Sequence, residues 1–261
     1  MKVFEFTPDG MEGCHVTAWL HTEHENGEME ARVRPAMVIC PGGGYLMTSD
    51  REAEPVAQVY YAAGYQTFIL RYATGEEAKD FKPFFQLEAT IAHVRKFATE
   101  WLIAEDKVAV IGFSAGAHLA ASSGTLFNEV GKNIRPDAMI LCYPVITSDE
   151  HAHVASIERV SGNPQGALEY EWFGLDKHVD EQTPPTFLWH TVTDPLVPVE
   201  NSLKMAMALS KHKVPYELHV FPEGGHGMSV CSKSVGTESA YNARWTEWSV
   251  KWLNKLFDFE G

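Results

Sequence analysis

The distribution of apolar and polar residues along the chain predicts strands that alternate with helices. Compact apolar runs, typical of buried strands, occupy residues 36–40 and 67–72, and further strands are predicted at residues 108–111, 138–143, 186–190 and 216–221. The segments between them predict helices at residues 54–63, 84–101, 115–123 and 202–211, and residues 241–256 have the spacing of a closing amphipathic helix. Two short alternating segments at the start, residues 3–6 and 15–21, are typical of antiparallel edge strands.

This order of elements predicts an α/β fold with one mostly parallel sheet and helices on both of its faces. The chain has no internal repeat, low-complexity tract or linker, so we expect residues 1–261 to form one domain. Residues 23–34 are charged and contain glycine, which favours an exposed loop. Residues 148–183 are polar with little periodicity, and we interpret them as an insertion that could cap a site.

Charge and cysteine content narrow the classes of function. The formal net charge of −14 argues against nucleic acid and anionic membranes as partners, although a solvated acidic surface identifies no substrate. No window is apolar enough for a membrane helix, and residues 1–6 lack the apolar core of a signal peptide. The four cysteines are far apart in sequence, which favours a reduced, cytoplasmic protein. The tryptophan and methionine content would also allow an apolar homodimer patch.

The strongest chemical signal is Gly112-Phe113-Ser114-Ala115-Gly116, a Gly-x-Ser-x-Gly motif. It follows a predicted strand and opens a predicted helix, which is the context that a nucleophile elbow requires. The motif alone is common by chance, and a glycine-flanked turn with Ser114 as a helix N-cap is the alternative. The strand before it and the helix after it favour Ser114 as a nucleophile.

A serine nucleophile needs a base and a group that orients the base, and both are expected after later strands. Asp194 follows the predicted strand at residues 186–190, and we prefer it as the orienting acid to Asp149, Asp176 and Asp180 in the insertion. His226 follows the last predicted strand and lies between glycines in Gly224-Gly225-His226-Gly227, so it is the predicted base. The alternative for Asp194 is a turn-forming aspartate before a proline, and the alternative for His226 is a histidine in a surface loop.

The other histidines have plainer interpretations. His118 lies one helical turn after Ser114 and is expected to pack behind the elbow, and His190 is expected to be buried in its strand. His151 and His153 could line the mouth of the insertion or face water. His21 and His24, with Glu23 and Glu25, resemble a metal cluster only weakly, because no further ligands recur at metal-binding spacing. We therefore predict no metal site.

Backbone donors for a developing oxyanion are expected from two places. The amide of Ala115 follows the nucleophile, and Gly42-Gly43-Gly44 follows the predicted strand at residues 36–40. Glycine lets the amides of Gly43 and Gly44 turn toward a substrate without a Cβ in the way. A phosphate-binding loop is the weaker interpretation, since the Walker lysine and the spaced dinucleotide glycines are absent.

The chain resembles α/β-hydrolases of the esterase/lipase group, and more narrowly bacterial acetyl-esterase-like proteins, some described as xylan esterases or xylanase-associated hydrolases. The matching segments span residues 40–227 in the expected order: Cys40-Pro41-Gly42-Gly43-Gly44-Tyr45, Arg51-Glu52-Ala53-Glu54-Pro55, Gly112-Phe113-Ser114-Ala115-Gly116, Asp194-Pro195-Leu196-Val197-Pro198 and Gly224-Gly225-His226-Gly227. One departure is Pro41, which stands where the wider group has a histidine.

The resemblance implies a serine esterase with Ser114 as nucleophile, His226 as base and Asp194 as its orienting acid. It implies short-chain esters of small molecules as substrates, with acetyl as the preferred acyl group and sugars as the alcohol by analogy, and no cofactor. Tyr45, beside the glycine loop, is expected to narrow the acyl side, and Tyr170, Trp172 and Phe173 could stack on a sugar or belong to the core. The competing hypotheses are an oligopeptidase-type serine peptidase and a non-catalytic ligand-binding protein on the same fold.

Overall fold

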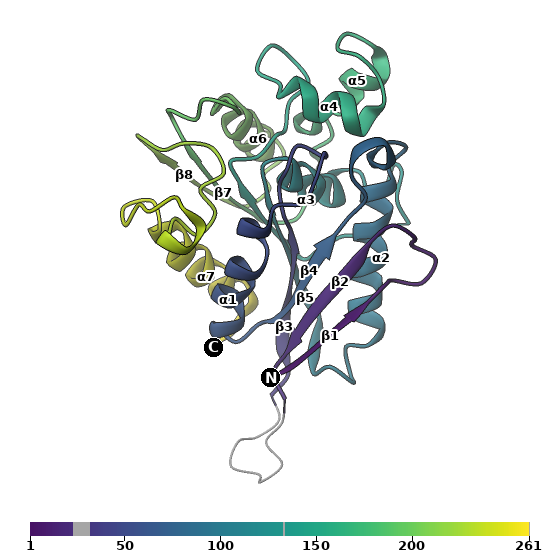
Figure 1. The fold of residues 1–261 in the computed structure, drawn as a ribbon, viewed down its shortest axis with the longest axis vertical. Coiled ribbons are helices and arrows are strands. Elements are labelled where there is room, and N and C mark those ends of the chain that lie inside the picture. The colour runs from purple at the N-terminus through teal and green to yellow at the C-terminus, as the bar shows by residue number, and fades with distance from the viewer. Residues whose placement is uncertain (23–31, 133, 261) are drawn as a thin grey trace.

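The predicted strands form one eight-stranded sheet in a computed structural model that describes residues 1–22, 32–132 and 134–260 (Figure 1). The spatial order is β1-β2-β4-β3-β5-β6-β7-β8; β1 and β2 pair antiparallel and the pairs from β4 to β8 are parallel. This arrangement confirms the predicted α/β class. The strands are β1 (Lys2–Phe6), β2 (His15–Leu20), β3 (Arg34–Cys40), β4 (Gln66–Arg71), β5 (Ile103–Phe113), β6 (Ala138–Cys142), β7 (Thr186–Thr191) and β8 (Tyr216–Phe221).

The central strands are apolar throughout because both of their faces are covered. In β3, Met37 and Ile39 belong to one hydrophobic core, whereas Val38 and Cys40 belong to the core on the opposite side of the sheet. Successive side chains of a strand point to opposite faces, so a strand between two cores has no polar face. The continuous apolar runs in the sequence therefore reflect burial on two sides.

Helices cover each face of the sheet (Figure 1). Buried residues of α1 (Glu54–Ala62) and α7 (Arg244–Phe257) join one core, and those of α2 (Lys82–Lys96), α3 (Ala115–Thr125) and α6 (Glu200–Lys211) join the other. The predicted helix at residues 84–101 ends early, at Lys96. Residues 97–101 are turns in which Phe97 and Trp101 stack on each other, so apolar spacing continues beyond the helix.

Strand β5 starts five residues before its predicted start. Arg34 of β3 pairs with Ile103, but Ala36 pairs with Val108, so the register shifts between these two pairs. The extra residues of β5 form an irregularity that carries Glu105, Asp106 and Lys107. Because these residues are charged, the first half of the strand could not be predicted from its apolar pattern.

The insertion at residues 148–183 contains two short helices, α4 (Val154–Ser161) and α5 (Leu168–Trp172), and a 3-10 turn, η3 (Leu175–Lys177). Figure 1 shows α4 and α5 at the top of the molecule, beyond the ends of the central strands. Helices of eight and five residues offer too few turns for a clear period, which explains why the sequence showed none.

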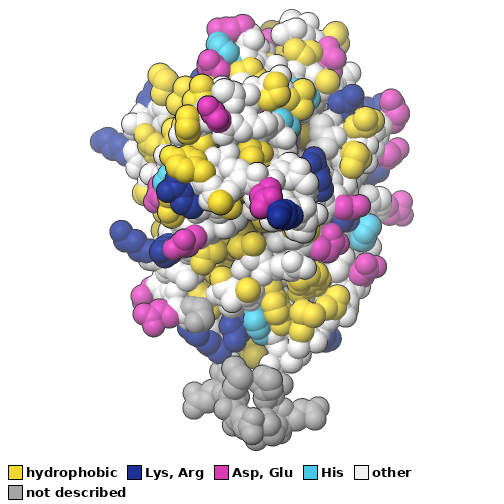
Figure 2. Space-filling model, turned by 60° about the vertical axis from the view of Figure 1, so that its left-hand side comes forward, with side chains coloured by type: hydrophobic (Ala, Val, Ile, Leu, Met, Phe, Trp, Pro, Cys, Tyr) yellow, Lys and Arg dark blue, Asp and Glu magenta, His cyan; other side chains and the backbone are white. Residues whose placement is uncertain are grey.

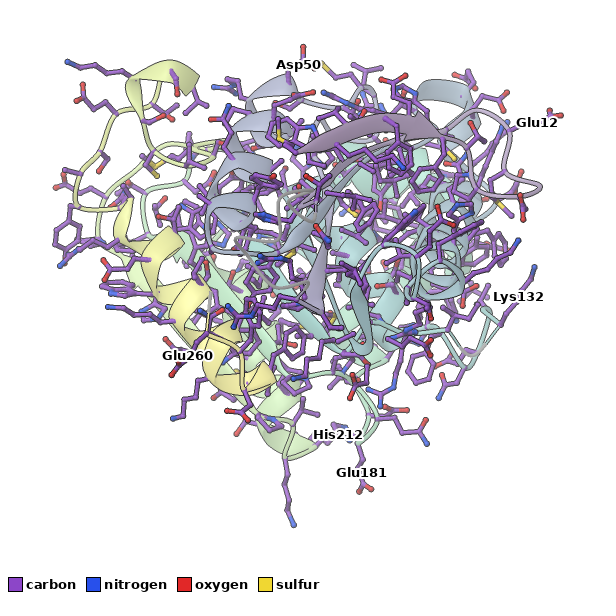
Figure 3. All side chains as sticks on the ribbon, turned by 90° about the horizontal axis from the view of Figure 1, so that it is seen from below. Glu12, Asp50, Lys132, Glu181, His212 and Glu260 are labelled. Carbon is purple, nitrogen blue, oxygen red and sulfur yellow. The ribbon has the colours of Figure 1, made fainter. Side chains whose placement is uncertain are left out.

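The predicted loop at residues 23–34 lies largely outside the described residues, which resume at residue 32. Within the described ranges, no helix has the length and apolar content needed to cross a membrane. All four cysteines are buried and free. Charges of both signs are interspersed on the face in Figure 2, and the labelled side chains of Glu12, Lys132 and Glu181 point away from the fold in Figure 3.

Candidate active site

Ser114 occupies a sharp turn between β5 and α3, as the Gly-x-Ser-x-Gly motif predicts. Its backbone has φ 54° and ψ −119°, a conformation that is strained for a residue with a side chain. A Cβ on Gly116 would lie 2.1 Å from the carbonyl oxygen of Cys40, and one on Gly112 would lie 2.2 Å from that of Gly116. Only glycine therefore allows β3, β5 and α3 to approach closely enough to form this turn.

Ser114, His226 and Asp194 are joined by two hydrogen bonds. His226 Nε2 lies 2.8 Å from Ser114 Oγ, and His226 Nδ1 lies 2.7 Å from Asp194 Oδ2. Because the ionised carboxylate can only accept, Nδ1 carries the proton and Nε2 accepts from the serine hydroxyl. The three residues follow β5, β7 and β8, whose carboxyl ends lie at the same edge of the sheet. The structure thus brings together the three side chains singled out from the sequence.

Asp194 is held in its ionised form by a set of donors. Its side chain is fully buried, and the backbone amides of Leu196 and Val197 donate to Oδ1 over 2.9 and 3.0 Å. Burial favours the neutral acid, but the hydrogen bonds from His190 and His226 and the Val197 amide outweigh it and hold the pKa of Asp194 well below its usual range. The carboxylate can therefore orient His226 over the whole neutral range.

His190 is a site residue whose role the sequence did not reveal. It is fully buried in β7, as predicted, with Nε2 3.0 Å from the Val197 carbonyl and 3.4 Å from Asp194 Oδ2. Its Nδ1 lies 2.8 Å from Ser202 Oγ, so the Ser202 hydroxyl can set the tautomer that presents N–H to the aspartate. The available signal was a histidine in an apolar strand four residues before the acid.

The alternative acids occupy other contacts. Asp149 forms an ion pair with Lys204, and Asp180 accepts hydrogen bonds from the backbone of Gln182 and Thr183. Asp176 is half-buried, and burial raises the pKa of its carboxyl. Among the described residues, Asp194 is the acid that His226 contacts.

Hydrogen bonds to the carbonyls of the glycine loop fix the direction of its amides. The carbonyl of Gly42 accepts from the Ser49 amide over 2.9 Å, and that of Gly43 accepts from the Leu46 amide over 3.0 Å. The carbonyl and N–H of one peptide group point in opposite directions, so these bonds orient the amides of Gly43 and Gly44. Within the described part of the chain, those two amides and that of Ala115 donate to no protein group. They are available to a bound anion.

Tyr45 does not take its expected place on the acyl side. Its backbone has φ 58°, and its side chain is only 1% exposed, with the hydroxyl 2.9 Å from His118 Nδ1. The side chain turns into the core behind the glycine loop, which leaves no surface for an acyl group. His118 Nε2 in turn lies 3.0 Å from the Phe173 carbonyl, and burial lowers the pKa of His118 to about 4. His118 thus packs behind the elbow as a neutral link, as expected.

The insertion contacts the glycine loop through Arg159 of α4. Arg159 Nη1 donates to the carbonyl oxygen of Gly44 over 3.0 Å. His153, just before α4, is partly buried, and burial together with the nearby charges of His226 and Arg159 lowers its pKa. His153 Nδ1 lies 2.8 Å from Ser156 Oγ of α4, so its side chain is held by the insertion itself. Tyr170 and Phe173 are buried in the core and cannot stack on a sugar, and Trp172 packs against the same core.

The described residues contain one group of metal-ligating side chains within 4.8 Å of one another, Asp149, Glu150 and His151. Lys204 already pairs with Asp149 at this position, so the group is an ion-pair cluster on the insertion. His21 instead contacts the Tyr61 carbonyl over 3.0 Å and stacks on the Tyr61 ring. His24, Glu23 and Glu25 lie outside the described residues.

Comparison with known proteins shows related enzymes. Endo-1,4-beta-xylanase B of Butyrivibrio fibrisolvens is 36% identical over 76% of this chain, and an acetylxylan esterase of Xylanibacter ruminicola is 28% identical over 85% of it. The chain spans 33% and 45% of the lengths of these two relatives. The crystal structure of an acetyl ester-xyloside bifunctional hydrolase from Caldicellulosiruptor lactoaceticus matches with a TM-score of 0.83 and 35% identity, over 95% of this chain and 89% of that one.

The solved structure matches nearly the whole sheet and its helices, which confirms the α/β-hydrolase fold and the resemblance seen in the sequence. The sequence model of the prolyl oligopeptidase family matches residues 86–258, which include Ser114, Asp194 and His226. The chain therefore belongs to the prolyl oligopeptidase family of α/β hydrolases.

Proposed function

We propose that this protein is a serine carboxylic-ester hydrolase that acts on short-chain acyl esters, acetyl esters of sugars above all. The observation that carries the proposal is the hydrogen-bonded series Ser114–His226–Asp194, which lies beside oriented and unoccupied amides. The acetyl and sugar parts draw on the relatives, which include an acetylxylan esterase and an acetyl ester-xyloside hydrolase.

The geometry supports two-step acyl transfer to water. Ser114 Oγ attacks the ester carbonyl while His226 Nε2 takes the hydroxyl proton, and the carbonyl π electrons move to the oxygen. As the tetrahedral intermediate collapses, the bond to the leaving alcohol breaks and His226 protonates that alcohol. Water then repeats the sequence on the acyl-serine, which releases the acid and restores Ser114.

The negative oxygen of the intermediate would be bound by the amides of Gly43, Gly44 and Ala115. Their directions are fixed before substrate arrives, so little reorganisation is needed when charge develops. Asp194 contributes by stabilising the imidazolium that His226 becomes. No step of this mechanism needs a metal or an organic cofactor.

A polar groove beside the glycine loop suits a hydroxyl-rich alcohol. It has a volume of about 480 Å³ and lies between α4, the segment 75–79 and Leu46; its polar lining is Glu76, Lys79, Glu158, Arg159 and Asn163. Arg159 joins this groove to the glycine loop through Gly44. A larger groove of about 1120 Å³ lies between residues 7–12 and α2. Neither groove is lined by Ser114, Asp194 or His226, and the smaller one is preferred because of the bond from Arg159 to Gly44.

Peptide hydrolysis is the second candidate, because the matching family model is that of the prolyl oligopeptidases. The same serine, base and acid cleave esters and amides, so substrate choice must be measured. A non-catalytic binding role fits less well, since Ser114, His226 and Asp194 are all present and within hydrogen-bonding distance of one another.

The test compares wild-type protein with Ser114→Ala on p-nitrophenyl acetate, butyrate and octanoate, then on acetylated xylo-oligosaccharides. We expect the rate to fall with acyl length in the wild type and by at least about a thousandfold in the variant, with unchanged folding. Aminoacyl- and prolyl-p-nitroanilides form the peptidase arm. Hydrolysis of the anilides without the esters would replace the esterase proposal, and equal rates in both proteins would rule out Ser114.

A further inference from the structure

Glu52 is a buried carboxyl that the mechanism has not used. It is 3% exposed, whereas Asp50, two residues earlier, is 90% exposed at its side chain and points away from the fold (Figure 3). Burying a carboxyl is costly unless hydrogen bonds compensate. Glu52 belongs to the Arg51-Glu52-Ala53-Glu54-Pro55 segment, which has no other evident part in the chemistry.

One oxygen of Glu52 holds the glycine loop. Oε2 accepts a hydrogen bond of 2.8 Å from the amide of Gly42, the residue directly before the proposed oxyanion donors. A Cβ on Gly42 would lie 2.7 Å from this oxygen and 3.1 Å from Ser114 Cβ, so the carboxyl, the loop and the nucleophile are in close packing. Displacement of Glu52 would therefore displace the loop.

The other oxygen holds the loop that carries His226. Tyr143 Oη donates to Glu52 Oε1 over 2.6 Å, and the same Tyr143 oxygen accepts from the Ser229 amide over 2.8 Å. The Tyr143 ring also lies edge-on to the His226 ring, with centroids 5.1 Å apart. The Cβ position of Gly227 is 3.9 Å from Glu52 Oε1. Glu52 and Tyr143 thus form a bridge beneath the catalytic group.

We propose that Glu52 is a positioning residue for acyl transfer: it ties the glycine loop to the His226 loop and, as a carboxylate, favours the positive charge that His226 acquires in the reaction. The inference rests on the proposed hydrolase activity. Catalysis requires a fixed distance between the oxyanion donors and the base. Glu52 can maintain that distance because it is bonded to the glycine loop and, through Tyr143, to the loop that carries His226.

Several titratable and charged groups surround Glu52 and His226. Glu52 is faced by Tyr143, Tyr72, Cys142, Arg51 and His226, and His226 is faced by Asp194, Glu52, Tyr143 and His153. Burial has the largest effect and raises the pKa of Glu52 above its usual value, although its hydrogen bonds with Tyr143 and Gly42 and the charges of His226 and Arg51 act in the opposite direction. A positive His226 and an ionised Glu52 therefore stabilise each other.

The test measures Glu52→Gln, Glu52→Asp and the control Glu54→Gln, which removes the same charge from a partly buried ion pair with Arg71, away from the Glu52–Tyr143 bridge. Glu52→Gln should lower kcat for p-nitrophenyl acetate by about tenfold to a hundredfold and change KM by less than about threefold. The acid limb of its kcat/KM profile should move to lower pH, because protonated His226 loses a stabilising charge. Glu52→Asp should lower kcat without moving that limb, and Glu54→Gln should match the wild type.

Wild-type kcat and an unmoved acid limb in Glu52→Gln would overturn the inference and leave the esterase proposal standing. Equal losses in both Glu52 variants with an unmoved limb would show a purely structural role, which also overturns it. If Glu52→Gln fails to fold, Tyr143→Phe cuts the same bridge with no change of charge and should lower kcat at constant KM. If the wild type hydrolyses no ester, the rate of Ser114 phosphonylation by an organophosphonate replaces kcat.

Discussion

The catalytic edge of the sheet and the insertion at residues 148–183 are built in different ways. At the edge, Ser114, Asp194 and His226 lie beyond the carboxyl ends of the parallel strands β5, β7 and β8, and the Asp194 side chain is fully buried among backbone donors. The insertion contains short helices, and it contacts the glycine loop directly through Arg159. Its Phe173 carbonyl also contacts His118 of α3, which in turn contacts Tyr45 after that loop. We infer that the sheet positions the proposed catalytic residues, whereas the insertion would shape the substrate side and should therefore tolerate substitution better.

The largest expected effect is the loss of activity when Asp194 at the sheet edge is replaced. Asp194→Asn keeps the size of the side chain but presents an amide to His226 Nδ1, which favours the wrong tautomer. We expect kcat/KM for p-nitrophenyl acetate to fall by about a thousandfold to ten-thousandfold. Asp180→Asn, in the insertion, is the control and should retain wild-type activity. A loss below about tenfold in Asp194→Asn would contradict the assigned role.

The same substitution has a pH-dependent effect on stability. The folded-state pKa of Asp194 is lowered, so its carboxylate stabilises the fold at pH values above the ordinary aspartate range near 4. That contribution is lost as the pH falls through the lowered folded-state pKa. The difference in unfolding free energy between wild type and Asp194→Asn should therefore shrink from about pH 7 to about pH 3 in urea titrations. A difference independent of pH would contradict the lowered pKa.

A smaller effect, measured as a loss of stability, is expected at the elbow. Gly116→Ala places a Cβ against the carbonyl oxygens of Cys40 and Pro41, at 2.1 and 2.3 Å, where backbone must move. Overpacking of this kind costs about 1–3 kcal/mol, which would lower Tm by about 3–10 °C. Gly225→Ala is the matched control, because its Cβ would meet open space. Equal Tm values for the two variants would show that the elbow is not tightly packed.

The smallest effect is expected in the insertion. Arg159→Met keeps the aliphatic stem but removes the hydrogen bond to Gly44 and a polar wall of the 480 Å³ groove. We expect kcat/KM for p-nitrophenyl acetate to fall by about twofold to fivefold, since a single hydrogen bond contributes about 1 kcal/mol. Arg135→Met, whose guanidinium contacts the Gln182 carbonyl, is the control. A loss as large as that of Asp194→Asn would mean that the insertion belongs to the catalytic group.

The sequence predicts those parts of the site that depend on strand order. Ser114, Asp194 and His226 could be singled out because each follows a predicted strand, at the edge where the carboxyl ends of parallel strands meet. The prediction that Tyr45 lies on the acyl side was wrong, because its positive φ turns the side chain inward. No local sequence pattern predicts that backbone conformation. The contacts of Glu52 join segments far apart in sequence, which a pattern of apolar positions does not contain. The contacts of His190 are closer in sequence, with Asp194, Val197 and Ser202, but they depend on how the loop after β7 folds, which that pattern does not contain either.

We propose above that Ser114 is a nucleophile that His226 activates and that lies beside the glycine loop. The most direct measurement is to incubate the protein with an organophosphonate p-nitrophenyl ester and to locate the added mass by peptide mass spectrometry. We predict one adduct, on Ser114, with formation at least about a hundredfold slower in His226→Ala. An adduct on another residue, or equal labelling rates with and without His226, would contradict the account.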